Sequence, residues 1–180
     1  MKLLKPLYIQ NRFFYACITL IVLFVLSFVF TRWFEIVKLL FLVFLVFTVL
    51  DIMLLFTAKK GVNGLRTLPE KFSNGDQNPI HLSVENYYRF PIFIKIIDEI
   101  PVQFQVRNFS IERKLDATSK AQLQYELRPT ERGEYHFGNL NIYSSSVLGL
   151  VSRRQQYSAE AMVPNYPSFL QLKKYDLIAF

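Results

Sequence analysis

Cysteine and histidine are scarce in this chain of 180 residues. The single cysteine, Cys17, lies in an apolar stretch, which excludes a disulfide framework or a cysteine-based metal site within one chain. The two histidines, His81 and His136, stand in alternating, strand-like segments without partners at zinc-site spacing. Both are expected to face solvent from a strand. These absences remove disulfide frameworks and the common zinc sites from consideration.

Other catalytic patterns are lacking as well. Asp98 and Glu99 are adjacent acids that could suggest acid/base chemistry. Consecutive residues of a strand point to opposite faces, so a solvated turn before Pro101 is the favoured interpretation. The stretch "SNGDQNP" (73–79) lacks the lysine and the strand–helix context of a phosphate loop. We therefore predict no catalytic, cofactor or metal residues, and a protein that is not an enzyme.

Charge is missing from two long runs near the amino terminus. No charged residue occurs from Phe13 to Thr31 or from Leu39 to Leu50. As a helix, the first run is about 28 Å long, close to the thickness of a bilayer core. Two transmembrane helices, about residues 13–31 and 36–57, are predicted within residues 1–58. A secretory signal peptide is the competing interpretation, but the length of the run and the immediate second run disfavour it.

Basic residues flank the open end of this hairpin. The net charge is +7, of which residues 1–58 carry +3 and residues 59–180 carry +4. The positive-inside rule then places both termini and the following domain in the cytoplasm, on a multi-pass membrane protein. The alternative is the reversed orientation, with an extracytoplasmic binding or adhesion module. Scattered charge and the lack of a nucleic-acid-binding motif argue against a nucleic-acid partner.

Asp51 interrupts the second apolar run. An acid in a spanning segment is by default a functional residue, such as a proton or ion relay. No second acid and no histidine lies within the two apolar runs. The favoured interpretation is a carboxylate that reaches the interface or bonds within the helix pair.

The period of the sequence changes to two after Lys60. Apolar residues alternate in "IHLSVEN" (80–86), in "VQFQVRNF" (102–109, with Val102, Phe104 and Val106 on one face) and in "AQLQYELRP" (121–129). Several short alternating strands separated by turn signals are typical of a β-sandwich. An all-β, immunoglobulin-like sandwich is predicted for residues 59–167. Aromatic residues at 87, 88 and 90 are either core residues, which is favoured, or a contact surface.

The stretch "RPTERGEYHFGNL" (128–140) crowds charge around one glycine. It lies between two expected strands, and Gly133 can adopt the positive φ that a turn requires. A turn that closes a β-hairpin is the favoured interpretation. Arg132 is expected to reach backbone carbonyls or an acid such as Glu131 or Asp98.

Four stretches in order carry a resemblance: "FSNGDQNPIHLSVEN", "IIDEIPVQFQ", "YELRPTERGEYHFGNLNIYSSSVLGLVSRR" and "VPNYPSF". They resemble the amino-terminal half of a bacterial membrane-protein family catalogued as domain of unknown function fifty-eight. One departure is Ser146-Val147, where relatives often have Asp-Pro, and it implies a local change in the turn. The positions that match the family's signature are structural: Gly75, Asp76, Arg128, Pro129, Arg132, Gly133, Tyr135, Gly138 and Gly149.

The resemblance implies a function. Members of that family continue into a von Willebrand A-like domain, whose signature does not occur here, and residues 168–180 are expected to be a linker or the truncated start of that domain. The family implies a membrane-anchored scaffold in the bacterial inner membrane that works with a MoxR-type AAA+ ATPase and von Willebrand A-type proteins. The partner, the oligomeric state and any ligand are beyond these residues.

Overall fold

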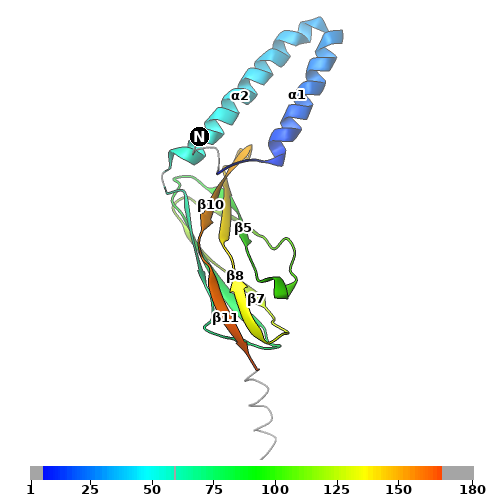
Figure 1. Cartoon of the computed structure of the whole chain (residues 1–180). Helices are drawn as coiled ribbons and strands as arrows, with labels where there is room; N and C mark the ends of the chain where they lie inside the picture. The colour runs from blue at the N-terminus through cyan, green and yellow to red at the C-terminus, as the bar shows by residue number, and fades with distance from the viewer. Residues whose placement is uncertain (1–5, 59, 168–180) are drawn as a thin grey trace, which may run out of the picture.

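The structure, a computed structural model, describes residues 6–58 and 60–167 and shows two helices at one end of an elongated β-domain (Figure 1). Helix α1 (Asn11–Val29) and helix α2 (Phe34–Thr57) are joined by the short 3-10 helix η1 (Thr31–Trp33). Both are long and apolar enough to cross a bilayer, and few of their residues are buried. The prediction of two long apolar helices is therefore confirmed.

The rest of the described chain is built from short strands. They are β1 (Leu7–Ile9), β2 (Val62–Thr67), β3 (Phe72–Ser73), β4 (Asn78–Asn86), β5 (Ile92–Asp98), β6 (Ile111–Leu115), β7 (Lys120–Leu127), β8 (Gly133–Phe137), β9 (Leu140–Ser145), β10 (Val151–Tyr157) and β11 (Ala161–Tyr166). The 3-10 helix η2 (Val102–Phe104) follows β5.

The strands form two facing layers. The five-stranded sheet β1-β10-β9-β5-β6 packs against the three-stranded sheet β2-β4-β7, and a third sheet, β3-β11-β8, lies toward the end away from the helices (Figure 1). Strand β1 brings the segment before α1 into the first sheet by pairing with β10. The fold is an all-β, immunoglobulin-like sandwich preceded by two apolar helices, as predicted.

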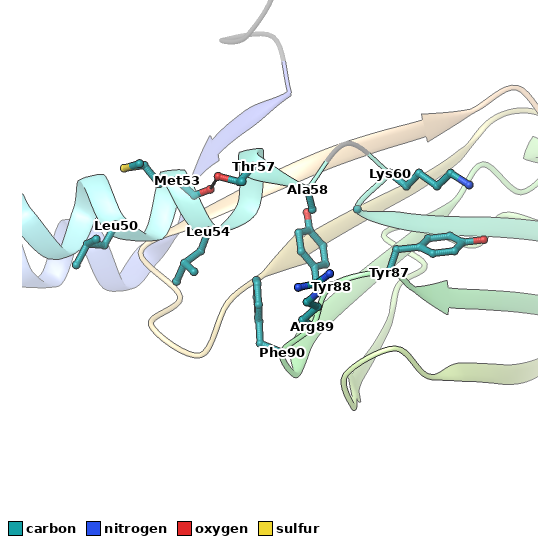
Figure 2. Close-up of a pocket in the computed structure, with 11 residues that line it drawn as sticks. Leu50, Met53, Leu54, Thr57, Ala58, Lys60, Tyr87, Tyr88, Arg89 and Phe90 are labelled. Atoms are coloured by element: carbon teal, nitrogen blue, oxygen red, sulfur yellow. Dashed lines mark hydrogen bonds between the residues drawn. The ribbon is translucent and has the colours of Figure 1, made fainter.

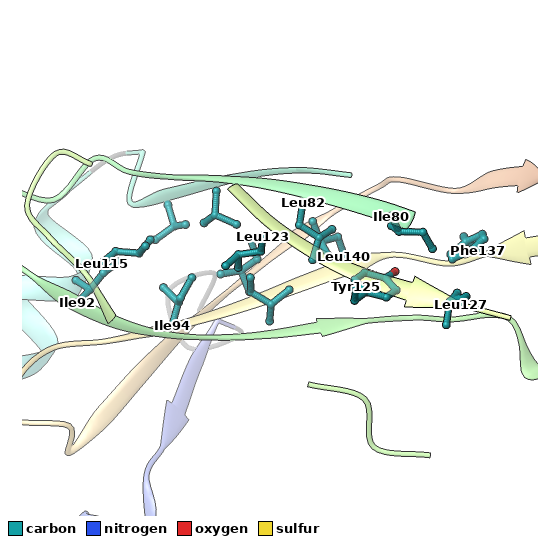
Figure 3. Close-up of a cluster of buried hydrophobic side chains, with 14 of the residues drawn as sticks. Ile80, Leu82, Ile92, Ile94, Leu115, Leu123, Tyr125, Leu127, Phe137 and Leu140 are labelled. Atoms are coloured by element: carbon teal, nitrogen blue, oxygen red, sulfur yellow. The ribbon is translucent and has the colours of Figure 1, made fainter. Parts of the chain in front are cut away.

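Alternation with period two explains the core. Ile80, Leu82 and Val84 on β4 are at most 1% exposed. They belong to one buried cluster with Ile92 and Ile94 of β5 in the opposite layer (Figure 3). The neighbouring residues on β4 point outward. Burial of apolar surface stabilises the fold by about 25 cal/mol per Å². This burial selects the pairing register of β4, because a slip by one residue would expose all of its buried apolar side chains.

Gly64 allows the two layers to approach each other. A Cβ atom built on Gly64 would lie 2.3 Å from Ile142 Cδ1 of β9 and 3.2 Å from Leu140 Cδ2. The glycine therefore sits where the backbone of β2 passes directly over the side chains of the opposite sheet.

The segment after β5 differs from the prediction. Residues 102–106 were expected to be a strand, but Val102–Phe104 form η2, and Gln105 and Asn108 have left-handed backbones. Val102 is 87% exposed. The strand prediction is wrong here because Pro101 and the two left-handed residues interrupt the extended chain. Phe104 still packs against the core, with its ring centroid 4.8 Å from that of Tyr135.

The segment 128–132 also differs from the prediction. It follows β7, which pairs with β4, and it precedes β8, which pairs with β11 in another sheet. The connection is a crossing between sheets, so the β-hairpin interpretation is wrong. Gly133 does have the expected positive φ, 138°.

Candidate functional site: the joint between the second helix and the sandwich

Asp51 lies on the last turns of α2, where the helix meets the sandwich. Its side chain is 0% exposed although long apolar neighbours on the same helix face outward. Helix α2 contacts β10 in particular. A buried carboxylate is tolerated only when its oxygens are hydrogen-bonded, because desolvation of an unpaired charge costs several kcal/mol.

The turn between β9 and β10 supplies those hydrogen bonds. The Ser146 hydroxyl donates to Asp51 Oδ1, and the backbone N–H groups of Leu150 and Val151 both donate to Oδ2 at 3.0 Å. Gly149, with a φ of 64°, gives the turn the left-handed residue that brings these donors together. A charged acceptor that receives three donors is held more strongly than a neutral one.

A second set of contacts holds the carboxyl-terminal end of α2. Arg153 Nη1 donates to the carbonyl oxygens of Leu55 at 2.9 Å and Ala58 at 2.7 Å. The Tyr88 hydroxyl also donates to the Leu55 carbonyl at 2.9 Å. These bonds satisfy carbonyls that a helix end leaves free, and the guanidinium complements the negative end of the helix dipole.

We call these groups the joint: Asp51, Leu55 and Ala58 on the helix side, and Tyr88, the turn 146–151 and Arg153 on the sandwich side. Leu55 itself is fully buried and belongs to the core of the sandwich. The joint therefore combines apolar packing with six hydrogen bonds. The Asp51 carboxylate and the Arg153 guanidinium are both bound within the protein, which indicates a structural role for the joint.

One interpretation of Asp51 was wrong, because its carboxylate does not bond within the helix pair. It accepts hydrogen bonds from a turn 95 to 100 residues further along the chain. Ser146 is one of its donors. Asp51 stands out in the sequence as an acid in an apolar run, but nothing in the sequence indicates which groups donate hydrogen bonds to it.

A groove of about 840 Å³ lies beside the joint (Figure 2). Its walls come from the exposed side of α2 and from the loop between β4 and β5. Eleven residues line it: Leu50, Met53, Leu54, Thr57, Ala58, Lys60, Gly61, Tyr87, Tyr88, Arg89 and Phe90.

The aromatic residues at 87–90 divide between the two interpretations given for them. Tyr88 is 1% exposed and belongs to the core, as favoured. Tyr87 and Phe90 are only half-buried and line the groove. The Tyr88 and Phe90 rings are 5.0 Å apart, so the groove wall is continuous with the core.

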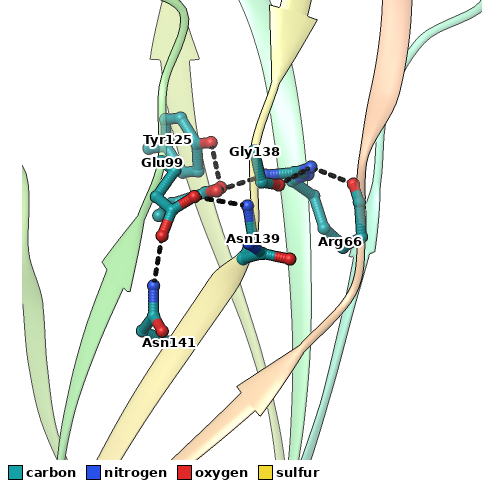
Figure 4. A network of polar contacts seen from close by, with 8 residues as sticks. Arg66, Glu99, Tyr125, Gly138, Asn139 and Asn141 are labelled. Carbon is teal, nitrogen blue, oxygen red and sulfur yellow. Dashed lines mark hydrogen bonds and ion pairs between the residues drawn. The ribbon is translucent and has the colours of Figure 1, made fainter.

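A buried ion pair crosses the sandwich further from the helices (Figure 4). Arg66 of β2 pairs with Asp98 of β5 and donates to the carbonyls of Gly138, at 2.9 Å, and Ala159. The Tyr125 hydroxyl of β7 donates to the other oxygen of Asp98 at 2.6 Å. The network therefore ties both layers together and satisfies both charges.

Asp98 and Glu99 diverge as two consecutive residues of an extended chain should. Asp98 is 3% exposed, so the solvated-turn interpretation is wrong for it. Glu99 points the other way and accepts from Asn139 N and Asn141 Nδ2, each at 2.8 Å (Figure 4). The acids do not converge on a common site.

Burial governs the titration of this network. It raises the pKa of Asp98, and the hydrogen bond from Tyr125 and the charge of Arg66 oppose that rise. Burial, the Asp98 charge and its hydrogen bond raise the pKa of Tyr125 far above its ordinary value. Tyr125 therefore stays a hydrogen-bond donor throughout the range in which proteins work.

The structure brings two signature motifs together. Arg128 Nε donates to the Gly75 carbonyl at 2.6 Å, and the Gly75 N–H donates to the Pro129 carbonyl at 2.8 Å. Gly75 has a φ of 79°, in the turn before β4 that also contains Asp76. The Ser73 hydroxyl donates to Asp76 at 2.5 Å and holds that turn. These positions join β3, β4 and the crossing segment.

The other signature residues have separate roles. Tyr135 is a core residue whose hydroxyl donates to the Glu131 carbonyl at 2.8 Å. Gly138 passes so close to Glu99 that an added Cβ would lie 2.4 Å from Glu99 Oε2. Arg132 is exposed, and the expected Arg132–Asp98 contact is wrong because Arg66 occupies that acid.

The two histidines lie where they were expected. His81 on β4 and His136 on β8 are both exposed on the outer side of their strands. His136 Nε2 lies 3.5 Å from a Glu134 carboxylate oxygen. Within residues 6–58 and 60–167, no three His, Cys, Asp or Glu side chains gather as a metal site would require.

Comparisons with known proteins bear on the sandwich. No family model matches the chain, and no curated protein matches it in sequence. A PapD-like domain of human CEP192 has a TM-score of 0.44 at 11% identity, over 61% of this chain and 87% of that one. A CARDB domain from Pyrococcus furiosus, solved with di-metal ions, has a TM-score of 0.38 at 11% identity, over 59% and 93%.

The carboxyl-terminal domain of wzt is also similar, with a TM-score of 0.40 at 8% identity, over 61% of this chain and 75% of that domain. Likeness at this level concerns the strand arrangement alone. The function has to be argued from the joint and its surroundings.

Proposed function

We propose that this protein is a membrane-anchored, non-enzymatic interaction module. The two apolar helices cross the bilayer as a hairpin, and the joint presents the sandwich at a fixed position beside the membrane. The observation that carries the proposal is Asp51, a carboxylate of α2 that is buried and receives three donors from the β9–β10 turn. A flexible tether would not need such a group.

The exposure of the helices supports membrane insertion. Leu39, Leu42 and Met53 of α2 are each more than half exposed, as are Ile18 and Val25 of α1. A helix that is apolar on all sides needs either a protein core or lipid around it. The sandwich covers only the end of α2, so lipid is the remaining apolar environment.

The site supports binding rather than chemistry. The two buried acids are engaged within the protein, Asp51 by the turn and Asp98 by Arg66 and Tyr125. The terminal strands of the two facing sheets include β6 and β7, whose outer edges offer backbone groups to a partner strand. A partner protein is therefore the proposed ligand of the sandwich.

The resemblance to the family of unknown function fifty-eight supplies a more specific proposal. On that basis the chain is a bacterial inner-membrane scaffold that holds a von Willebrand A-like domain in longer relatives and works with a MoxR-type AAA+ ATPase. The sandwich and both termini are then cytoplasmic. The support is the order of the signature motifs and the basic residues at the open end of the hairpin.

Two fractionation measurements test the proposal. Alkaline carbonate should leave the chain in the membrane pellet, and release into the supernatant would refute membrane anchoring. Protease added to intact spheroplasts should spare the sandwich, while protease added to inverted vesicles should digest it. The opposite pattern would instead support an extracytoplasmic binding or adhesion module.

A further inference from the structure

The groove beside the joint has an apolar half and a basic half. Along its length, Leu50 and Leu54 of α2 come first, Phe90 and Arg89 follow, and Lys60 with Tyr87 lies at the sandwich end (Figure 2). Leu54 is 45% exposed and Leu50 is 44% exposed. The groove is thus a continuation of the outer apolar surface of α2.

Positive charge gathers at the end near the sandwich. Arg89 and Lys60 are both exposed, and Lys60 Nζ lies 5.4 Å from the centroid of the Tyr87 ring. The nearby acid, Glu85, accepts a hydrogen bond from the Tyr87 hydroxyl at 2.8 Å. Two cations, Arg89 and Lys60, therefore line the groove at the level where α2 ends.

The position fixes which molecule has the matching shape and charge. If α2 crosses the bilayer, Thr57 and Ala58 lie where the hydrocarbon core gives way to the headgroups. An acyl chain matches the apolar half, and an anionic phosphate matches the positive charge of the two exposed cations that line the other half. A partner helix would match the apolar half but would leave both cations without a counter-charge.

We infer that this groove binds one anionic phospholipid from the adjacent leaflet, with an acyl chain along Leu50, Leu54 and Phe90 and the headgroup phosphate at Lys60 and Arg89. The inference rests on the proposed membrane anchoring. Bound at the joint, the lipid would contact both α2 and the β4–β5 loop, and so would stabilise the docked position of the sandwich.

Native mass spectrometry of the full chain in detergent tests this site. The probes are phosphatidylglycerol and phosphatidylcholine with identical acyl chains. We expect one phosphatidylglycerol to be retained in preference to phosphatidylcholine. In the double variant Lys60→Gln/Arg89→Gln the affinity for phosphatidylglycerol should fall about 25-fold, given roughly fivefold for each basic residue near a membrane surface.

A matched control removes two charges elsewhere. The double variant Arg107→Gln/Arg132→Gln changes two exposed arginines outside the groove and should retain the lipid as the unmodified chain does. Leu54→Trp fills the apolar half without changing charge and should also weaken retention. Glycerol phosphate, a headgroup without acyl chains, should not displace the lipid.

Several results would overturn the inference. Equal retention of the two lipids, equal loss in the control variant, or displacement by glycerol phosphate would each do so while leaving membrane anchoring intact. Release of the chain by alkaline carbonate would overturn both the anchoring and the lipid site.

Discussion

Replacing Asp51 with alanine should release the second helix from the sandwich. The change removes a charged acceptor and leaves the N–H groups of Leu150 and Val151 buried without a partner. Hydrogen bonds to charged groups contribute about 1.5–3 kcal/mol, and an orphaned buried donor costs about 1–3 kcal/mol. A loss of about 3 kcal/mol in the stability of the joint is therefore expected.

Hydrogen exchange of the chain in lipid nanodiscs measures this loss directly. A change of about 3 kcal/mol corresponds to roughly hundredfold faster exchange of the Leu150 and Val151 amides, at tenfold for each 1.4 kcal/mol. The control is Thr48→Ala, whose hydroxyl bonds only to the Phe44 carbonyl of its own helix among the contacts described. Unchanged protection in Asp51→Ala would refute the role given to this carboxylate.

Three further predictions follow from the described contacts. Arg153→Ala removes two bonds to the end of α2 and should destabilise the joint by about 1–3 kcal/mol, seen as faster amide exchange in the last turn of the helix. Gly64→Ala should lower stability by about 1–3 kcal/mol in urea unfolding, because the new methyl group would overlap Ile142; an unchanged midpoint would contradict the close approach of the layers. Tyr125→Phe should reduce the loss of folding stability at alkaline pH. The raised pKa of Tyr125 keeps this side chain neutral in the folded state, whereas the same side chain ionises above pH 10 in the unfolded chain. The free energy of unfolding of the unmodified protein therefore falls as the pH rises past 10. Between pH 9.5 and 11 the free energy of unfolding, measured with urea, should fall by about 1 kcal/mol more in the unmodified protein than in Tyr125→Phe. An equal fall in the two proteins would contradict the buried network.

Hydropathy and alternation in the sequence predicted the helices and strands whose formation depends mainly on neighbouring residues. The predicted apolar segments, 13–31 and 36–57, match both helices to within two residues at each end, because length and hydropathy are local properties. Alternation predicted β4 and β7, whose inner faces are buried. The same alternation failed at residues 102–106, where apolar period two occurs without a neighbouring strand to pair with.

Contacts between distant segments could not be predicted from one sequence. The partners of Asp51 lie about 100 residues away, and those of Arg66 lie on three other segments. Segment 128–132 has the composition of a hairpin turn. Its flanking strands, β7 and β8, nevertheless pair with β4 and β11 and not with each other, and the composition of the turn does not reveal this. The joint was missed for this reason, although Asp51 marked its place.

The hydrogen bonds of the joint should make the helical anchor and the sandwich one rigid unit. Electron paramagnetic distance measurement tests this, with spin labels at Leu39 on α2 and Thr130 on the sandwich, in nanodiscs and with Cys17 replaced by serine. We expect a single narrow distance distribution that broadens in Asp51→Ala. A distribution that is already broad in the unmodified protein would contradict it.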